Sequence, residues 1–134
     1  MRALDANVVL RYLLRDVAGQ WERAAGLIQS GEPLGMTAVA LAEVAWTLAG
    51  PQHRLDRLVV PGELIRFLDR ENILAVGFDK EVARVALLTC ARTTGAADFG
   101  DALITACARS FGIEEIYSFD QRFVRAGLTP IAPA

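Results

Sequence analysis

The fold is decided by residues 2–16, Arg2-Ala-Leu-Asp-Ala-Asn-Val-Val-Leu-Arg-Tyr-Leu-Leu-Arg-Asp16. Residues 2–5 are a short apolar run that predicts a strand ending on an acidic residue, Asp5. From Asn7 to Arg15 the apolar side chains recur at the spacing of a helix. The chain therefore begins with a strand that is followed at once by a helix.

The same alternation continues to the end of the chain. Further strands are predicted over residues 34–37, 73–77, 115–119 and 128–131. Helices are predicted over residues 20–29, 38–49, 61–69, 79–92 and 99–111, with a helical turn at 120–125. Asp79 is the expected cap of one helix, Gly112 the expected end of another, and Pro130 favours an edge strand. Short strands that alternate with helices indicate an α/β fold, in which helices cover both faces of a parallel sheet.

Composition favours a single globular domain over residues 1–134, with 53% hydrophobic residues and a mean hydropathy of +0.30. No apolar run reaches the roughly 18 residues that a membrane span needs, and the first residues do not resemble a signal peptide. Cys90 and Cys107 lie in apolar helical patterns, which suits a reducing, cytoplasmic location. His53 is the sole histidine and lies in a polar loop, so neither a zinc site nor a histidine base is expected.

Four acidic residues stand where a carboxylate is unexpected: Asp5, Glu43, Asp101 and Asp120. We expect them to be embedded among apolar residues, where an ionised carboxylate is costly unless it is paired or binds a metal. Ligands of parallel α/β sheets bind beyond the carboxyl ends of the strands, an edge that all four residues can reach. Hard oxygen ligands in this number suit Mg²⁺ or Mn²⁺. The net charge of −2 argues against bulk binding of nucleic acid, but a bound cation inverts the local sign.

Each of these acids also has a purely structural explanation. Asp5 is suited to be a helix N-cap. Asp98 is suited to cap the helix that contains Asp101, which leaves Asp101 to complement the helix dipole. Asp120 is suited to cap the last helical turn, and Glu43 to make a structural hydrogen bond.

With these residues in place, the chain resembles the PIN-domain family, and within it the VapC-type toxin ribonucleases of type II toxin–antitoxin systems. The resemblance rests on four segments: Leu4-Asp-Ala-Asn-Val-Val-Leu-Arg-Tyr-Leu-Leu-Arg-Asp16, Val39-Ala-Leu-Ala-Glu-Val-Ala-Trp46, Asp98-Phe-Gly-Asp-Ala-Leu-Ile-Thr-Ala106 and Tyr117-Ser-Phe-Asp-Gln-Arg-Phe123. It implies a three-layer α/β/α fold around a mostly parallel sheet of about five strands. It also implies endonucleolytic cleavage of RNA that depends on Mg²⁺ or Mn²⁺.

The resemblance assigns roles to the acidic residues and to those that support them. Asp5, Glu43, Asp101 and Asp120 would form the acidic metal site, and Asp98 would hold metal through water or orient Asp101. Asn7 and Ser118 match small polar positions that support such a site. Thr105 lies four residues after Asp101, and its hydroxyl would bond a ligand or water, or else its own helix backbone.

The remaining implications concern partners. Arg11 and Arg15 are four residues apart and would contact RNA, unless they form an ordinary solvated face. A VapB-like antitoxin would lay an apolar helix into a groove of the protein, and a homodimer is expected.

Three other functions remain open at this stage. A phosphatase or phosphotransfer domain with Asp5 as nucleophile often carries an Asp two residues later and a lysine at a strand end, but this chain has Asn7 there and Lys80 as its sole lysine. A housekeeping nuclease in RNA processing and a non-catalytic RNA- or protein-binding PIN module are the other two.

Overall fold

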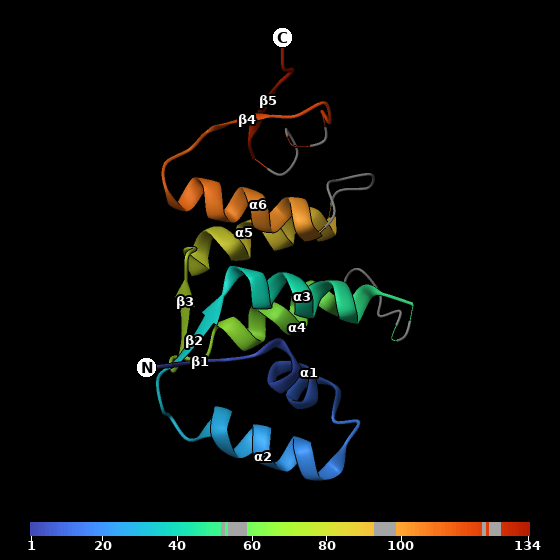
Figure 1. Cartoon of the computed structure of the whole chain (residues 1–134), viewed down its shortest axis with the longest axis vertical. Coiled ribbons are helices and arrows are strands. Elements are labelled where there is room, and N and C mark those ends of the chain that lie inside the picture. Colours follow the sequence, from blue (N-terminus) through green and yellow to red (C-terminus); the bar gives the residue numbers. More distant parts are fainter. Residues whose placement is uncertain (52, 54–58, 93–98, 122, 124–126) are drawn as a thin grey trace. The chain divides into compact units, whose positions relative to one another are not determined.

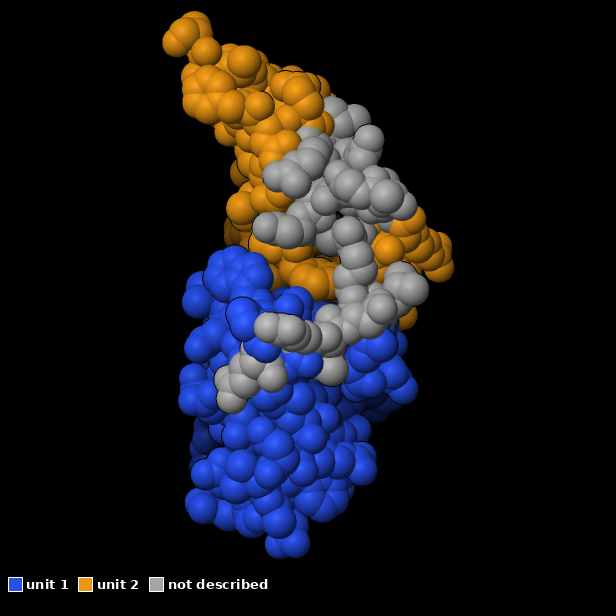
Figure 2. All heavy atoms as spheres, turned by 90° about the vertical axis from the view of Figure 1, so that its right-hand side faces the viewer, with its two compact units in different colours: residues 1–76 blue, residues 77–134 orange. Residues whose placement is uncertain are grey.

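The computed structural model describes residues 1–51, 53, 59–92, 99–121, 123 and 127–134 (Figure 1). The chain forms two compact units, residues 1–76 and residues 77–134 (Figure 2). In the described residues there is no helix with the length and apolar character that a membrane crossing requires.

A parallel sheet with the strand order β1-β2-β3 organises the first unit. Its strands are β1 (Arg2–Ala3), β2 (Leu34–Thr37) and β3 (Ile73–Val76), with Arg2 opposite Leu34 and Leu34 opposite Ile73. The central strand β2 is buried from Leu34 to Met36, as expected for a parallel strand covered on both faces. At Gly35, a Cβ atom would lie 3.2 Å from Cγ2 of Val76, so glycine permits the close approach of β3.

The described helices of this unit are α1 (Ala6–Leu14), α2 (Ala18–Gln29), α3 (Ala38–Ala49) and α4 (Val59–Leu68). Helix α1 packs against α2 and α3, and α3 packs against α4 (Figure 1). The contacting faces carry fully buried side chains such as Val9, Ile28, Leu41 and Leu64. Thr37 starts α3, because its hydroxyl oxygen accepts a hydrogen bond of 3.1 Å from the backbone N–H of Ala40.

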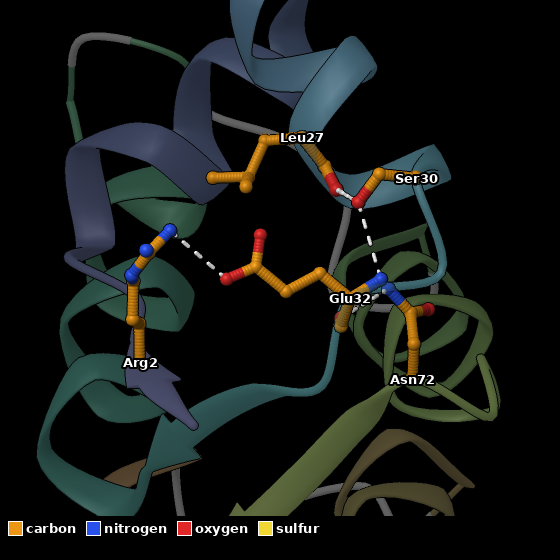
Figure 3. Close-up of polar contacts among 5 residues, drawn as sticks. All are labelled: Arg2, Leu27, Ser30, Glu32 and Asn72. Carbon is orange, nitrogen blue, oxygen red and sulfur yellow. Dashed lines mark hydrogen bonds and ion pairs between the residues drawn. The ribbon is translucent and has the colours of Figure 1, made fainter.

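A polar network fixes the connection between α2 and β2 (Figure 3). The Ser30 hydroxyl donates to the carbonyl of Leu27 at 2.7 Å and accepts from the backbone N–H of Glu32 at 3.1 Å. The Asn72 amide donates to the carbonyl of Glu32 at 3.1 Å, and the Glu32 carboxylate pairs with Arg2 at 3.0 Å. Arg2 is in β1, Glu32 precedes β2 and Asn72 precedes β3. The network therefore links the three strands at the end of the sheet where they begin.

The second unit contains α5 (Lys80–Arg92), α6 (Phe99–Ser110), β4 (Glu115–Tyr117) and β5 (Thr129–Ile131). Asp79 caps α5, since its carboxylate accepts from the backbone N–H groups of Glu81 and Val82 at 2.9 and 3.1 Å. Gly112, with φ of +75°, follows the end of α6. Strands β4 and β5 pair in parallel, with Pro130 opposite Ile116.

These observations confirm the α/β class with parallel strands, the capping role of Asp79 and the position of Gly112. In the described residues the strands form one sheet of three and one of two, so a single five-stranded sheet stays a prediction, as does the single domain. The strands predicted over residues 2–5 and 115–119 are too long, since β1 ends at Ala3 and β4 ends at Tyr117. The predicted turn at 120–125 lies partly outside the described residues.

Candidate functional site

Asp5 lies between the end of β1 and the start of α1. The backbone N–H of Leu4 still bonds the carbonyl of Gly35 at 2.8 Å, which carries the pairing with β2 one residue past β1. Asp5 then adopts extended angles (φ −79°, ψ 148°) at the N-cap of α1, and its carbonyl accepts from the N–H of Val8 at 3.1 Å. Its exposed carboxylate makes no capping hydrogen bond and no ion pair with any described residue. The capping explanation of this side chain is therefore not supported, and its oxygens are available to a cation.

Glu43 lies in α3 on the face opposite the core. The buried face consists of Ala40, Leu41, Val44, Ala45 and Leu48. Glu43 is exposed on the other face, where Val39 and Trp46 are 78% and 58% exposed. In the part of the chain that the structure describes, its carboxylate has no hydrogen-bond or ion-pair partner. A structural hydrogen bond therefore does not explain Glu43.

Asp101 and Thr105 occupy successive turns of α6. Asp101 is half-buried in the first turn of the helix. Thr105 is 1% exposed, and its hydroxyl is buried without a hydrogen-bond partner among the described residues. It borders a groove of about 270 Å³ that Glu81, Thr89 and Arg109 also line. The bond to its own helix backbone, the alternative explanation of Thr105, is thus not made.

Asp120 follows the end of β4 through a short turn. The Ser118 N–H donates to the carbonyl of Ile131 at 3.0 Å, which continues the pairing with β5. The Ser118 hydroxyl then accepts from the backbone N–H of Asp120 at 2.9 Å. This turn fixes the backbone of Asp120, which is half-buried. The supporting role of Ser118 at a metal site stays a prediction.

The expectation that all four acids are embedded was wrong. Asp5 and Glu43 are exposed, while Asp101 and Asp120 are half-buried. Desolvation therefore does not force these groups to bind a metal. What favours a cation at Asp5 and Glu43 is instead that their carboxylates have no hydrogen-bond or ion-pair partner among the described residues.

The structure describes these acids in two places, Asp5 and Glu43 in the first unit and Asp101 and Asp120 in the second. Within the described residues of either unit, no three His, Cys, Asp or Glu side chains gather closely enough to hold a metal ion. Asp98 lies outside the described residues. A site shared by all four acids therefore stays a prediction.

The predicted RNA contacts differ from each other in their surroundings. Arg11 pairs with Asp16 at 3.2 Å. Arg15 lies beyond the end of α1 in a left-handed conformation (φ 54°), and its guanidinium stacks 5.2 Å from the centre of the Trp21 ring. Asn7 is exposed in the first turn of α1, two residues after Asp5. The RNA-binding roles of Arg11 and Arg15, and the supporting role of Asn7 at the metal site, stay predictions.

A groove beside Asn7 was not predicted. It lies between α1 and α2 and includes Gln20 and Arg23 in addition to Asn7 and Arg11. The signal in the sequence is weak, because Gln20 and Arg23 are ordinary residues of an exposed helix face. Their proximity to Asn7 depends on how α2 packs against α1, which a single helix pattern does not encode.

In a comparison with protein families, residues 2–128 match the PIN domain. Searches of curated proteins and of solved structures found no match. The matched range begins at β1, ends just before β5 and includes all four acidic residues. Because the match spans nearly the whole chain, this protein belongs to the PIN domain family.

Proposed function

We propose that this protein is an endoribonuclease that depends on Mg²⁺ or Mn²⁺ and acts as the toxin of a toxin–antitoxin pair. PIN domains are generally nucleases, which supports hydrolysis of a phosphodiester bond. The observation that carries the proposal is the carboxylate of Asp5, which stands at the end of a parallel strand and has no partner among the described residues. A carboxylate so placed is suited to a divalent cation at the ligand-binding edge of an α/β sheet.

The donor set fits Mg²⁺ or Mn²⁺ better than a softer metal. Asp5, Asp101 and Asp120 would hold one ion, and Glu43 would hold a second ion or orient the attacking water. All four donors are carboxylates, and hard cations prefer oxygen ligands. A bound divalent cation would position water and offset charge on the phosphate. Ser118 would support the site by fixing the turn that carries Asp120.

The direct test is cleavage of total RNA by the purified protein in Mg²⁺, in Mn²⁺ and in EDTA. We expect discrete fragments with either metal, no fragments with EDTA, and no fragments from Asp5→Asn or Glu43→Gln. Glu22→Gln is the matched control, since Glu22 is also an exposed helical glutamate without a partner among the described residues. Normal cleavage by Asp5→Asn would refute the metal-site assignment.

The toxin role makes a separate prediction about a partner. We propose that a VapB-like antitoxin binds this protein with an apolar helix and directs a basic side chain toward the acidic residues. Induced expression should arrest bacterial growth, Asp5→Asn should not, and co-expression of the small DNA-binding protein encoded by a neighbouring gene should restore growth. Cleavage in vitro without growth arrest would favour a housekeeping role in RNA processing.

A homodimer is also part of the proposal. Sedimentation velocity of the purified protein should give the mass of two chains, and a single-chain mass at micromolar concentration would argue against it.

A further inference from the structure

A groove of about 390 Å³ lies between α1 and α2 in the first unit. Its polar lining is Asn7, Arg11, Gln20 and Arg23, and its apolar lining is Val8, Ala24 and Leu27. The two helices pack side by side, so the groove has two walls from segments that are adjacent in space (Figure 1). The groove begins beside the proposed cation site, because Asn7 is in the first turn of α1 and Asp5 is the N-cap of the same helix.

The polar groups of this groove are largely unused by the protein itself. The side chains of Asn7, Gln20 and Arg23 are exposed and make no hydrogen bond or ion pair with any described residue. Arg11 pairs with Asp16 through Nη1 at 3.2 Å, but its Nε is buried and lacks a partner among the described residues. The groove therefore offers two guanidinium groups, one of them uncompensated, and two amides.

The lining has the mixed character that a nucleotide requires. Ala24 is buried and Val8 and Leu27 are half-buried, so they form an apolar surface under the polar side chains. A base can pack on such a surface while amides bond its edge, and a guanidinium can pair with its phosphate. Base pairing hides the Watson–Crick edge, so an unpaired nucleotide fits this chemistry better than a duplex.

We propose that this groove binds a nucleotide of single-stranded RNA next to the cleaved bond. Arg23 contacts the phosphate, and Asn7 and Gln20 contact the base. The inference rests on the proposed ribonuclease function and adds to it a contact surface for the substrate on α2. It also makes Asn7 a contact to RNA at the junction between the groove and the acidic site.

The test measures binding of a fluorescent single-stranded RNA to the Asp5→Asn protein, which does not consume the RNA, across a series of salt concentrations. Adding Arg23→Gln should weaken binding by roughly threefold to tenfold and flatten the slope of log affinity against log salt by about 0.7, the share of one phosphate contact on a single strand. Gln20→Ala should weaken binding without changing the slope, because an amide releases no counterion.

Arg66→Gln is the matched control. It removes the same charge from the first unit, but Arg66 is on α4 outside the groove and pairs with Glu63 at 2.8 Å. If Arg23→Gln and Arg66→Gln give the same RNA affinity and the same salt slope, the groove does not bind RNA. In that case, if Arg23→Gln alone weakens capture of a protein partner, the groove is assigned to that partner. RNA cleavage by the wild type separates this failure from failure of the proposed function. If the two variants bind RNA equally and the wild type cleaves normally, RNA binding in the groove is refuted and the ribonuclease function stands. If the protein neither binds nor cleaves RNA, both proposals are refuted.

Discussion

Asp5 occupies the N-cap position of α1, yet its carboxylate accepts no hydrogen bond from the first turn of that helix. A capping side chain typically contributes about 1 kcal/mol to stability, which Asp5 does not supply. A capping hydrogen bond therefore does not explain the aspartate at this position. The sequence placed Asp5 between the first strand and the first helix, although β1 ends two residues earlier, at Ala3. It could not show whether the carboxylate would turn back to cap the helix, because that depends on one side-chain rotation.

We expect Asp5→Asn to leave the free energy of unfolding within about 0.5 kcal/mol of the wild type, as is usual for a surface change away from structural contacts. Urea denaturation followed by circular dichroism, in EDTA, measures this value. A loss of several kcal/mol would mean that Asp5 is a structural residue, and the loss of cleavage in that variant would then have no bearing on metal binding.

Cys107 is a free thiol on α6, and burial raises its pKa above the ordinary value. The thiolate is the reactive form, so Cys107 should alkylate more slowly in the folded protein than in urea, with a midpoint at higher pH. Because the folded-state pKa is the higher one, its contribution to stability is complete below the unfolded pKa and is lost as pH rises through the folded pKa. Iodoacetamide labelling with peptide mass spectrometry measures both midpoints. A folded midpoint at or below the unfolded one would contradict this prediction.

At the scale of elements, the sequence pattern of α3 predicts where the helix begins and ends but not which face is exposed. Its bounds were predicted correctly, since Ala38 follows the cap Thr37 and Ala49 precedes Gly50. Its exposed face was not predicted, because Val39 and Trp46 are apolar and hide the boundary between the two faces. The short strands were less predictable, because two to four residues become a strand only when a partner strand pairs with them.

Thr37→Ala should destabilise the protein by about 1 kcal/mol, since it leaves the backbone N–H of Ala40 without its capping oxygen. Thr37→Ser keeps that oxygen and is the matched control. The shift in the urea midpoint at constant slope measures the cost. Equal midpoints for Ala and Ser would mean that the hydroxyl does not cap α3 in solution.

At the scale of the whole molecule, the match to the PIN domain family covers both of the units that the structure describes. Residues 2–128 span both of them, and each unit contributes two of the four acids. Local patterns predicted where each acid stands relative to its own strand or helix. That the four acids meet in one site stays a prediction, and local patterns could not decide it, because such a site depends on contacts between segments that lie far apart along the chain.

Added Mg²⁺ or Mn²⁺ should stabilise the folded protein, since carboxylates that share a site repel one another without metal. At a free concentration of about 100 times Kd, the gain is about 2.7 kcal/mol, which raises Tm by on the order of 5–10 °C. Differential scanning fluorimetry across millimolar Mg²⁺ and Mn²⁺ measures the shift, with K⁺ at matched ionic strength as the control. A flat curve would count against a cation site.

The most direct test of a shared site is Mn²⁺ binding followed by electron paramagnetic resonance, in which free Mn²⁺ is counted as the protein is added. The measurement compares the wild type with Asp5→Asn from the first unit, Asp101→Asn from the second, and the control Glu22→Gln. If both units donate ligands to one ion, both Asn variants should bind Mn²⁺ at least tenfold more weakly, a cost of about 1.4 kcal/mol or more, and the control should bind as the wild type does. Unchanged Mn²⁺ affinity in either Asn variant would contradict a metal site shared by the two units.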